Sequence, residues 1–238
     1  MANKLGVRGV EIDARQDVDM TEMSASAIRQ IRKMLDDLNL RVAAIRFRTR
    51  RGYDCREDLD RRVSATKQCM RLAFDMGASV VVNQIGQVAS DLSSDSMTVL
   101  RDALMDIGQH GQRVGAFLAC ETGSEDLADL VAFIESLPDG SAGIALNPGN
   151  LLVNGFELTS LKNAARHIML VHAKDGVKDL ARGRGSEVPL GRGLAEFPEI
   201  IATLAEQQYA GYYVVEREIS KNPVEEIAQA VEFLRNVG

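Results

Sequence analysis

The sequence predicts a single-domain α/β barrel, and three observations carry this prediction. Short runs rich in β-branched residues alternate along the whole chain with longer amphipathic runs, a pattern typical of repeated βα units around a parallel sheet. The chain has 238 residues with 45% hydrophobic content, which is enough for one substantial core. No low-complexity segment or Pro- or Ser-rich linker divides it, so we predict one domain over residues 1–238.

Seven short apolar runs have the composition of strands. They cover residues 9–12, 41–47, 79–85, 115–121, 142–147, 168–175 and 212–218. Seven is one fewer than the eight strands that close a TIM (β/α) barrel. The chain begins with what reads as the last turn of a helix, a stop at Gly6, and then a strand. We therefore expect that the first βα unit is missing from the given start, or that the barrel is open on one side.

Amphipathic runs fill most of the intervals between these strands, and several open with Ser or Asp and close with Gly or Asn, as helices do. They cover residues 24–39, 60–77, 96–111, 124–137, 197–208 and 224–238. The longest irregular piece, residues 175–196, is rich in Gly and Arg and follows a strand. We predict an active-site loop there.

Composition excludes several classes of function. A formal net charge of −6 argues against a surface that neutralises nucleic-acid phosphates. No apolar run reaches the roughly 18 residues that span a bilayer, and the start lacks the apolar core of a signal peptide. We therefore predict a cytoplasmic protein with no nucleic-acid or membrane partner. Three cysteines without C-x-x-C spacing predict reduced, structural thiols.

Side chains that can bind a metal ion or transfer a proton lie where four consecutive predicted strands end. In a parallel barrel, catalytic groups lie at the carboxyl ends of the strands. Because inward positions repeat every second residue, each of these ends can direct one such side chain to the interior. These side chains are Glu121, Asn147, His172 and Glu216, and Lys174, Asp175, Arg217 and Glu218 lie beside them.

Two carboxylates, an imidazole and an amide oxygen suit a divalent ion such as Mn²⁺, Mg²⁺ or Co²⁺, with Zn²⁺ as a further option. Such an ion can chelate the carbonyl and neighbouring hydroxyl of a sugar and stabilise the enediolate left when a carbon-bound proton is removed. Glu121 and Glu216 would then serve as base and acid. The residues thus predict a metal-assisted isomerase or epimerase of a sugar, ketose or sugar acid.

Some of these residues have structural interpretations as well. A lone histidine at a strand end is more often packed and hydrogen-bonded than a ligand, and His172 stands out only because Glu121 and Glu216 coincide with it. Asp175 lies on the opposite face from His172 in a regular strand, so it can instead orient a neighbour or begin the loop.

A run of arginines, Arg46, Arg48, Arg50 and Arg51, leaves the second predicted strand. Such a run is usually a solvated face or the partner of nearby carboxylates. Its position at a strand exit makes the binding of an anionic substrate the alternative.

With the motifs ETG, NPGN, HAKDG, PLGRG and GYYVVERE in this order, the sequence resembles the xylose isomerase-like TIM barrels, the sugar phosphate isomerase/epimerase superfamily, from Leu5 onward. The resemblance of LGVRGVEI to the second strand unit of that family implies that the first unit is absent here. It also implies metal ligation by Glu121, His172 and Glu216, and a substrate-side acid at Asp175.

NPGN departs from the family pattern. Relatives such as the ketose 3-epimerases carry Asp at the position of Asn147 and often a substrate-contacting His at that of Asn150, although others read DPxNL. Asn147 keeps one oxygen donor but removes a charge, which implies a weak, altered or abandoned metal site. The Arg that some epimerases carry six residues after the His is Lys178 here. The predicted substrate contacts are Asn150, Lys174, Asp175, Lys178, Arg217 and Arg48.

Three functions follow as hypotheses. The first is the metal-assisted isomerase or epimerase with a small carbohydrate substrate. The second, motivated by Asn147 and the missing first unit, is a catalytically degenerate carbohydrate-binding or assembly protein. The third, the endonuclease IV branch of this fold, needs a histidine-rich trinuclear site, and three histidines in an acidic chain argue against it. Self-association into a homo-oligomer is a further prediction, because an open barrel wall would expose an apolar strand edge.

Overall fold

The computed structural model describes residues 2–20, 22–179 and 184–238. The chain forms two compact units, one of Met1–Cys120 with Ile134–Gly143 and the other of Glu121–Phe133 with Ile144–Gly238. Strands and helices alternate along both of them, as the sequence predicts.

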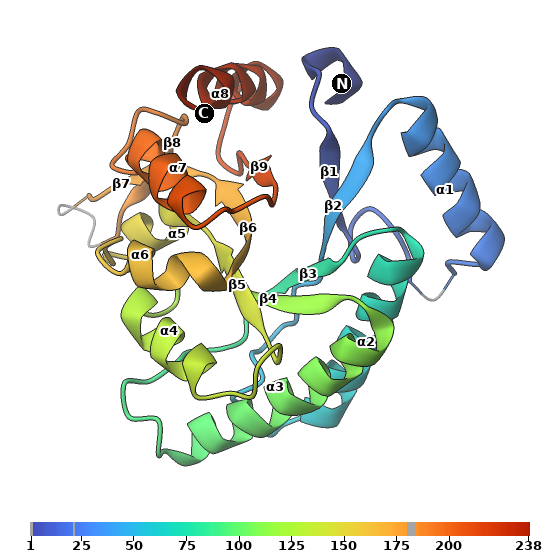
Figure 1. Ribbon diagram of the computed structural model, residues 1–238, viewed down its shortest axis with the longest axis vertical. Helices are drawn as coiled ribbons and strands as arrows, with labels where there is room; N and C mark the ends of the chain where they lie inside the picture. The colour runs from blue at the N-terminus through green and yellow to red at the C-terminus, as the bar shows by residue number, and fades with distance from the viewer. Residues whose placement is uncertain (1, 21, 180–183) are drawn as a thin grey trace. The chain divides into compact units, whose positions relative to one another are not determined.

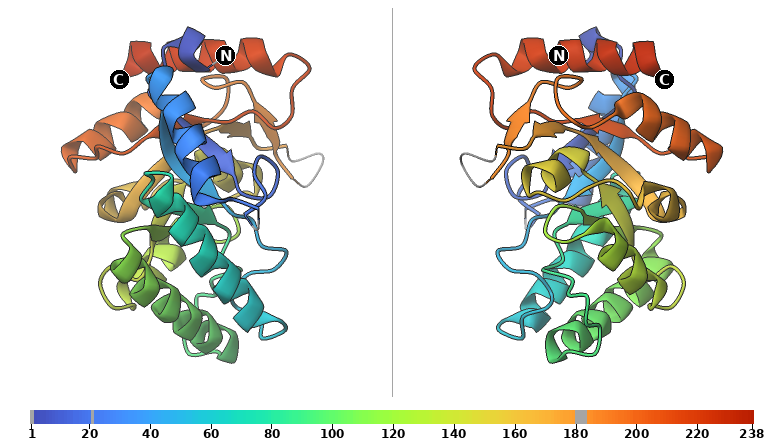
Figure 2. Two further views of the ribbon diagram at one scale, coloured as in Figure 1. Left: turned by 90° about the vertical axis from the view of Figure 1, so that its right-hand side faces the viewer. Right: turned by 90° about the vertical axis from the view of Figure 1, so that its left-hand side faces the viewer.

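The first unit contains four parallel strands that pair in chain order. They are β1 (Gly9–Asp13), β2 (Arg41–Arg46), β3 (Val80–Asn83) and β4 (Phe117–Glu121), of which the last residue belongs to the second unit. The helices that follow the first three strands are α1 (Ala25–Asp37), α2 (Leu59–Asp75) and α3 (Asp95–Val114). These helices lie along the outer side of the strands, and two further views show α2 and α3 side by side (Figures 1 and 2).

Apolar burial is concentrated in the middle strands of this unit. All four residues of β3 are buried, and Ile45 of β2 and Leu118 of β4 are 0% exposed. Strands of this kind are covered on both faces, which is why their sequences are continuous apolar runs. The chain enters the unit through a 3₁₀ turn (Ala2–Leu5) and Gly6, whose φ of 63° lies in the left-handed region. The predicted helix end with a glycine stop is therefore confirmed.

The second unit contains three parallel strands, β5 (Gly143–Leu146), β6 (Ile168–Ala173) and β9 (Tyr213–Val215), which pair in that order. Its helices are α4 (Leu127–Glu135), α5 (Pro148–Val153), α6 (Leu161–Ala164), a 3₁₀ turn (Ala165–His167), α7 (Phe197–Glu206) and α8 (Pro223–Val237). No helix within the described residues is long and apolar enough to cross a membrane.

All seven predicted strands are present, but five of them end earlier than predicted, and the early ends of the sixth and seventh affect predicted site residues. The sixth ends at Ala173, and Asp175 begins a separate strand, β7 (Asp175–Val177), which pairs antiparallel with β8 (Ser186–Val188). The irregular loop predicted over residues 175–196 is therefore wrong where this hairpin forms, and residues 180–183 lie outside the described part of the chain. The seventh strand ends at Val215, so Glu216 follows it. Strands of three residues are too short to show a two-residue period in the sequence.

Cysteine burial agrees with the predicted structural role of the thiols. Cys69 and Cys120 are buried and Cys55 is partly buried, and none of the three forms a disulfide within the described residues. Burial raises the pKa of the Cys69 thiol to about 12, so it stays protonated and unreactive at neutral pH.

Helix α3 passes very close to the backbone of Ser141 at Gly108. A Cβ at Gly108 would lie 2.4 Å from the Ser141 Cα and 2.5 Å from its carbonyl oxygen. Alanine in a helix interior is better than glycine by about 1 kcal/mol, but a backbone contact cannot be relieved by turning a side chain. We expect Gly108→Ala to lower the free energy of unfolding by about 1–3 kcal/mol in urea denaturation.

The matched control for this prediction is Gln109→Ala, on an exposed position of the same helix. It should change the free energy of unfolding by less than about 0.5 kcal/mol. A more stable Gly108→Ala variant would show that the helix can move away from Ser141 and would contradict the tight packing.

Candidate functional site

The second unit gathers four polar side chains at the ends of its strands. Glu121 ends β4, Asn147 follows β5, His172 lies near the end of β6, and Glu216 follows β9. Asn147 and His172 are 0% exposed and Glu121 is 2% exposed, while the Glu216 side chain is 7% exposed. The structure thus brings together the four residues that the sequence predicts as metal ligands.

The Asn147 amide joins the two glutamates. Its Nδ2 donates to Glu121 Oε1 at 3.1 Å and to Glu216 Oε2 at 3.3 Å. Its Oδ1 accepts from the backbone N–H of Asn150 at 3.0 Å. This pattern fixes the orientation of the amide, because the flipped form would place an oxygen against two carboxylates and an NH₂ group against an N–H. An aspartate could not make these two donations.

His172 faces the same two carboxylates. Its Nδ1 lies 3.3 Å from Glu121 Oε1 and 4.0 Å from Glu216 Oε2. The His172 imidazole and the Asn147 amide therefore both face the two largely buried glutamate side chains. Such a concentration of negative charge inside a protein requires a cation or strong hydrogen-bond donors nearby.

A short helix that was not predicted from the sequence holds Asn147 in place. Asn147 is the N-cap of α5, and Pro148 occupies its first turn. The Asn147 backbone N–H also donates to Thr122 Oγ1 at 2.8 Å. Asn before Pro is a known signal for a helix start, so the NPGN motif contained the information needed to predict α5.

Asn150, a predicted substrate contact, lies next to this group. Its Nδ2 is 3.4 Å from Glu121 Oε1. Gly123 makes room for it, because a Cβ at this glycine, whose φ is 132°, would lie 2.6 Å from the Asn150 Cβ.

Asp175 organises the chain around it. Its carboxylate accepts from the backbone N–H groups of Gly176 (2.8 Å), Gly191 (3.0 Å), Gly193 (2.8 Å) and Ala195 (3.0 Å). The residue is 1% exposed. Four donors occupy most of the acceptor capacity of one carboxylate, so Asp175 fixes the return of the chain after the β7–β8 hairpin. Its predicted contact with substrate stays a prediction.

The predicted cationic contacts are in ion pairs. Lys174 is 5% exposed, and its Nζ lies 2.9 Å from Glu218 Oε2. Arg217 Nη1 lies 2.7 Å from Glu187 Oε1. Its Nε contacts Glu226, and the hydrogen bond from Arg217 holds the pKa of that carboxyl below its usual range.

Two further predicted contacts lie elsewhere. The Lys178 Nζ is 3.4 Å from Glu157 Oε1 in a pair whose side chains are 40% and 64% exposed. It therefore takes part in a surface ion pair. Arg48 follows β2 and belongs to the first unit. In the second unit, Lys174 and Asp175 are buried and Asn150 is partly buried, and all three lie near strand ends.

Glu121, His172 and Glu216 fit a divalent metal ion by their donor chemistry. Two carboxylates and one imidazole are ligands that Mn²⁺, Co²⁺ and Zn²⁺ accept, and the His172 Nδ1 lies 3.3 Å from the Glu121 oxygen and 4.0 Å from the Glu216 oxygen. Asn147 directs its nitrogen, not its oxygen, at the glutamates. The prediction that Asn147 is itself a ligand stays a prediction.

The family described as xylose isomerase-like TIM barrel matches residues 1–237 of this sequence. The chain belongs to this family. The fold and the family predicted from the sequence motifs are thereby confirmed. The crystal structure of a xylose isomerase domain protein from Planctomyces limnophilus aligns with 99% of this xylose isomerase-like chain and 90% of its own, at a TM-score of 0.88 and 26% identity.

Two curated members of the superfamily are similar in sequence. An inosose dehydratase of Bacillus thuringiensis (strain Al Hakam) is 26% identical over 239 residues, which cover 86% of this chain and 79% of the dehydratase. The L-ribulose-5-phosphate 3-epimerase UlaE of Salmonella paratyphi C (strain RKS4594) is 37% identical over 71 residues, which cover 29% of this chain and 24% of the epimerase. The relatives of this xylose isomerase-like barrel thus include a dehydratase and an epimerase.

Proposed function

We propose that this chain is a sugar-modifying enzyme that removes a proton from the carbon next to a carbonyl group, as an isomerase or epimerase. The observation that carries the proposal is the pair of glutamates with largely buried side chains, Glu121 and Glu216, joined by the Asn147 amide at 3.1 and 3.3 Å. Similarity to an inosose dehydratase and a ribulose-phosphate epimerase supports a carbohydrate substrate.

Each glutamate has one oxygen held by Asn147 and a defined orientation. One glutamate takes the proton from the substrate carbon, and the other returns a proton to a neighbouring atom or to the opposite face. The side chains of Glu121 and Glu216 are 0% and 7% exposed, and this shielding limits protonation of the intermediate by water without stereochemical control. Lys174 lies near the end of the same strand as His172 and can donate to a substrate hydroxyl.

Glu121, His172 and Glu216 are the residues that would hold a divalent ion, with Mn²⁺, Mg²⁺, Co²⁺ or Zn²⁺ as candidates. When bound, the ion supplies positive charge to the carbonyl oxygen and so lowers the cost of the enediolate. Asn147, by donating to both glutamates, holds them side by side when no ion is bound.

Dehydration is the second candidate, because the inosose dehydratase is similar over 86% of this chain. It begins with the same removal of a proton next to a carbonyl. It differs in the next step, in which a hydroxyl on the adjacent carbon leaves as water and a carbon–carbon double bond forms. The proton that this hydroxyl needs would come from the second acid of the site.

Deuterium exchange tests the shared first step. The purified chain, supplied with MnCl₂ in D₂O, would be incubated with ketohexoses, a ribulose 5-phosphate and an inosose, and followed by proton NMR. We expect the signal of the hydrogen next to the carbonyl to disappear for at least one of them. An epimeric product supports epimerisation, and a dehydrated ketone supports the second candidate. Binding without exchange in any of these sugars would instead favour the non-catalytic hypothesis.

A further inference from the structure

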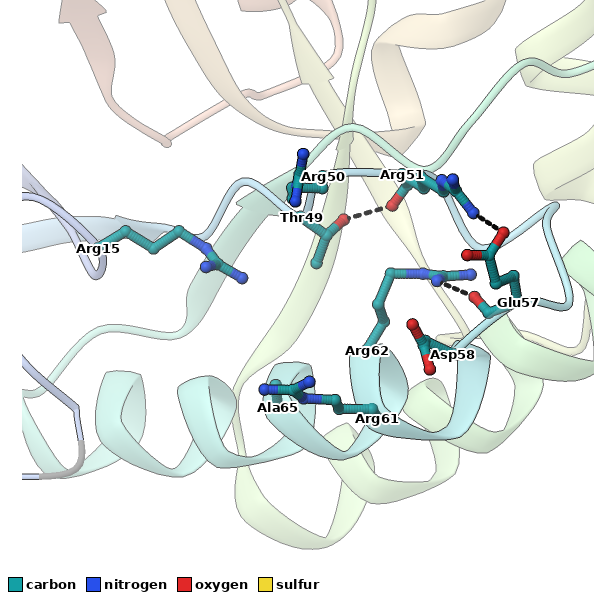
Figure 3. A pocket seen from close by; sticks show the side chains of 9 residues that line it. All are labelled: Arg15, Thr49, Arg50, Arg51, Glu57, Asp58, Arg61, Arg62 and Ala65. Atoms are coloured by element: carbon teal, nitrogen blue, oxygen red, sulfur yellow. Dashed lines mark hydrogen bonds and ion pairs between the residues drawn. The ribbon is translucent and has the colours of Figure 1, made fainter.

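The first unit contains an arginine-lined pocket of about 580 Å³. Its five arginines are Arg15, Arg50, Arg51, Arg61 and Arg62, and they come from the loop after β1, the loop after β2 and the first turn of α2. Figure 3 shows Arg15 extending from one side toward the space between Thr49 and the α2 arginines. We call this the arginine pocket.

Positive charge predominates in the arginine pocket although the chain as a whole is acidic. Its lining has five arginines against two carboxylates, Glu57 and Asp58, a formal excess of three positive charges. The whole chain has a net charge of −6. Arg51 is the arginine whose side chain pairs with Glu57. Like charges gathered around a concave surface repel one another and raise the local concentration of anions.

Three of the arginines are left with capacity for a ligand. Within the described residues, the side chains of Arg50 and Arg61 have no ion-pair or hydrogen-bond partner, and both residues are exposed. Arg62 donates through its two Nη atoms to the carbonyl oxygens of Glu57 and Cys55, but its buried Nε has no acceptor there. A buried N–H without an acceptor costs free energy unless a ligand supplies one.

The position of two of these arginines opposes helix stability. Arg61 and Arg62 lie in the first turn of α2, where the helix macrodipole favours anions and disfavours cations. The two arginines therefore make an unfavourable electrostatic contribution at this helix end, which Asp60 in the same turn offsets in part. An anion bound between them reverses the sign of that electrostatic contribution.

Buried hydrogen bonds fix two walls of the arginine pocket before any ligand arrives. Asn83 Nδ2 donates to Thr49 Oγ1 at 3.0 Å and to Tyr53 Oη at 2.7 Å, and Tyr53 Oη lies 2.6 Å from Thr66 Oγ1. Thr66 Oγ1 in turn donates to the Arg62 carbonyl oxygen at 2.9 Å. Burial raises the pKa of Tyr53 to about 12, so the phenol stays neutral. This network joins the loop after β2 to α2 and reduces the ordering that binding would require.

The third wall is fixed by an aromatic contact. The Arg15 guanidinium carbon lies 4.7 Å from the centre of the buried Phe47 ring, a cation–π distance. The Arg15 backbone N–H also donates to Asp13 Oδ1 at 2.8 Å. Arg15 is thereby held on the opposite side of the pocket from α2.

We propose that the arginine pocket binds the oxyanion of a small molecule, either a phosphate or a carboxylate. Guanidinium groups bind both anions through paired, charge-assisted hydrogen bonds. The volume falls in the range of small-molecule sites, about 300–1,000 Å³, and exceeds what a single phosphate would fill. The anionic group is therefore part of a larger polar molecule. This proposal is independent of the reaction assigned to the second unit.

Calorimetric titration of the full chain at low salt tests the proposal, with sodium pyrophosphate and trisodium citrate as probes. We expect binding of at least one probe and a loss of affinity of about tenfold or more in the double variant Arg50→Gln with Arg61→Gln. Arg71→Gln, on an exposed position near the other end of α2, is the control and should stay within about twofold. Selective binding of pyrophosphate identifies a phosphate site, and selective binding of citrate a carboxylate site.

Thermal unfolding separates a binding role from a structural one. In buffer without polyvalent anions, the double variant should melt at or above the wild-type temperature, because the substitutions relieve repulsion and remove no pair. Pyrophosphate or citrate should raise the melting temperature of the wild type more than that of the double variant. A lower melting temperature for the double variant, equal affinity in wild type and variant, or tighter binding of a single-stranded oligonucleotide than of either probe would overturn the proposal.

Discussion

Glu216→Gln is expected to slow deuterium exchange at the substrate carbon by about a thousandfold, within the range that general acid–base groups contribute. Glutamine has no carboxylate to accept or return a proton. Its Oε1 can still accept from Asn147 Nδ2, which lies 3.3 Å from the Glu216 oxygen, so the local fold should be kept. The measurement is the initial rate of loss of the proton signal in D₂O, with the melting temperature as a check on folding.

The control is Glu225→Gln, the same change at an exposed position in the first turn of α8. It should leave the exchange rate within about twofold of the wild type. If exchange survives in Glu216→Gln but is lost in Glu121→Gln, Glu121 is the base that removes the proton and Glu216 is the acid that returns it. Exchange at the wild-type rate in both variants would show that neither glutamate moves the proton.

The arrangement of the candidate site was predictable because it depends on position along strands. Glu121 and His172 occupy the ends of apolar runs, and parallel strands bring such ends to one edge of a sheet. Asn147 follows another apolar run in the same way. The direction of the Asn147 amide was not predictable, because it depends on the cap of α5 and on the facing carboxylates of two other segments.

The arginine pocket could be predicted only in part. The run from Arg46 to Arg51 suggests anion binding, but Arg46 lies 2.8 Å from Glu11 of the neighbouring strand in a largely buried ion pair. Arg15 and Arg61 meet Arg50 only after folding, and neither belongs to a sequence motif. Contacts between separate segments therefore decide which members of the run are available to a ligand.

The structure changes the interpretation of why residue 147 is an asparagine. From the sequence, its amide implies a metal site that has lost a charge. In the structure the amide donates to two buried carboxylates that would otherwise repel each other. Asparagine thus stabilises the pair of glutamates without an ion, and this role gives a second physical reason for the amide.

This interpretation predicts that Asn147→Asp will be strongly destabilising without metal and recovered by metal. The change removes two donations and places a third carboxylate beside Glu121 and Glu216, within a site that is almost fully buried. We expect the free energy of unfolding in EDTA to fall by about 2–4 kcal/mol, the cost of leaving buried charged groups without their donors. Urea denaturation measures this directly.

Excess MnCl₂ should raise the melting temperature of Asn147→Asp more than that of the wild type, because three carboxylates bind a hard cation more tightly than two. Asn154→Asp is the matched control: it makes the same change at the end of the same helix and breaks the bond from its Nδ2 to the Gly123 carbonyl oxygen at 2.7 Å. Asn154→Asp should lose stability without gaining a response to Mn²⁺. An Asn147→Asp variant as stable as the wild type in EDTA would mean that the amide does not hold the glutamates together, and the geometry of the site would then have to be maintained by His172 and Thr122.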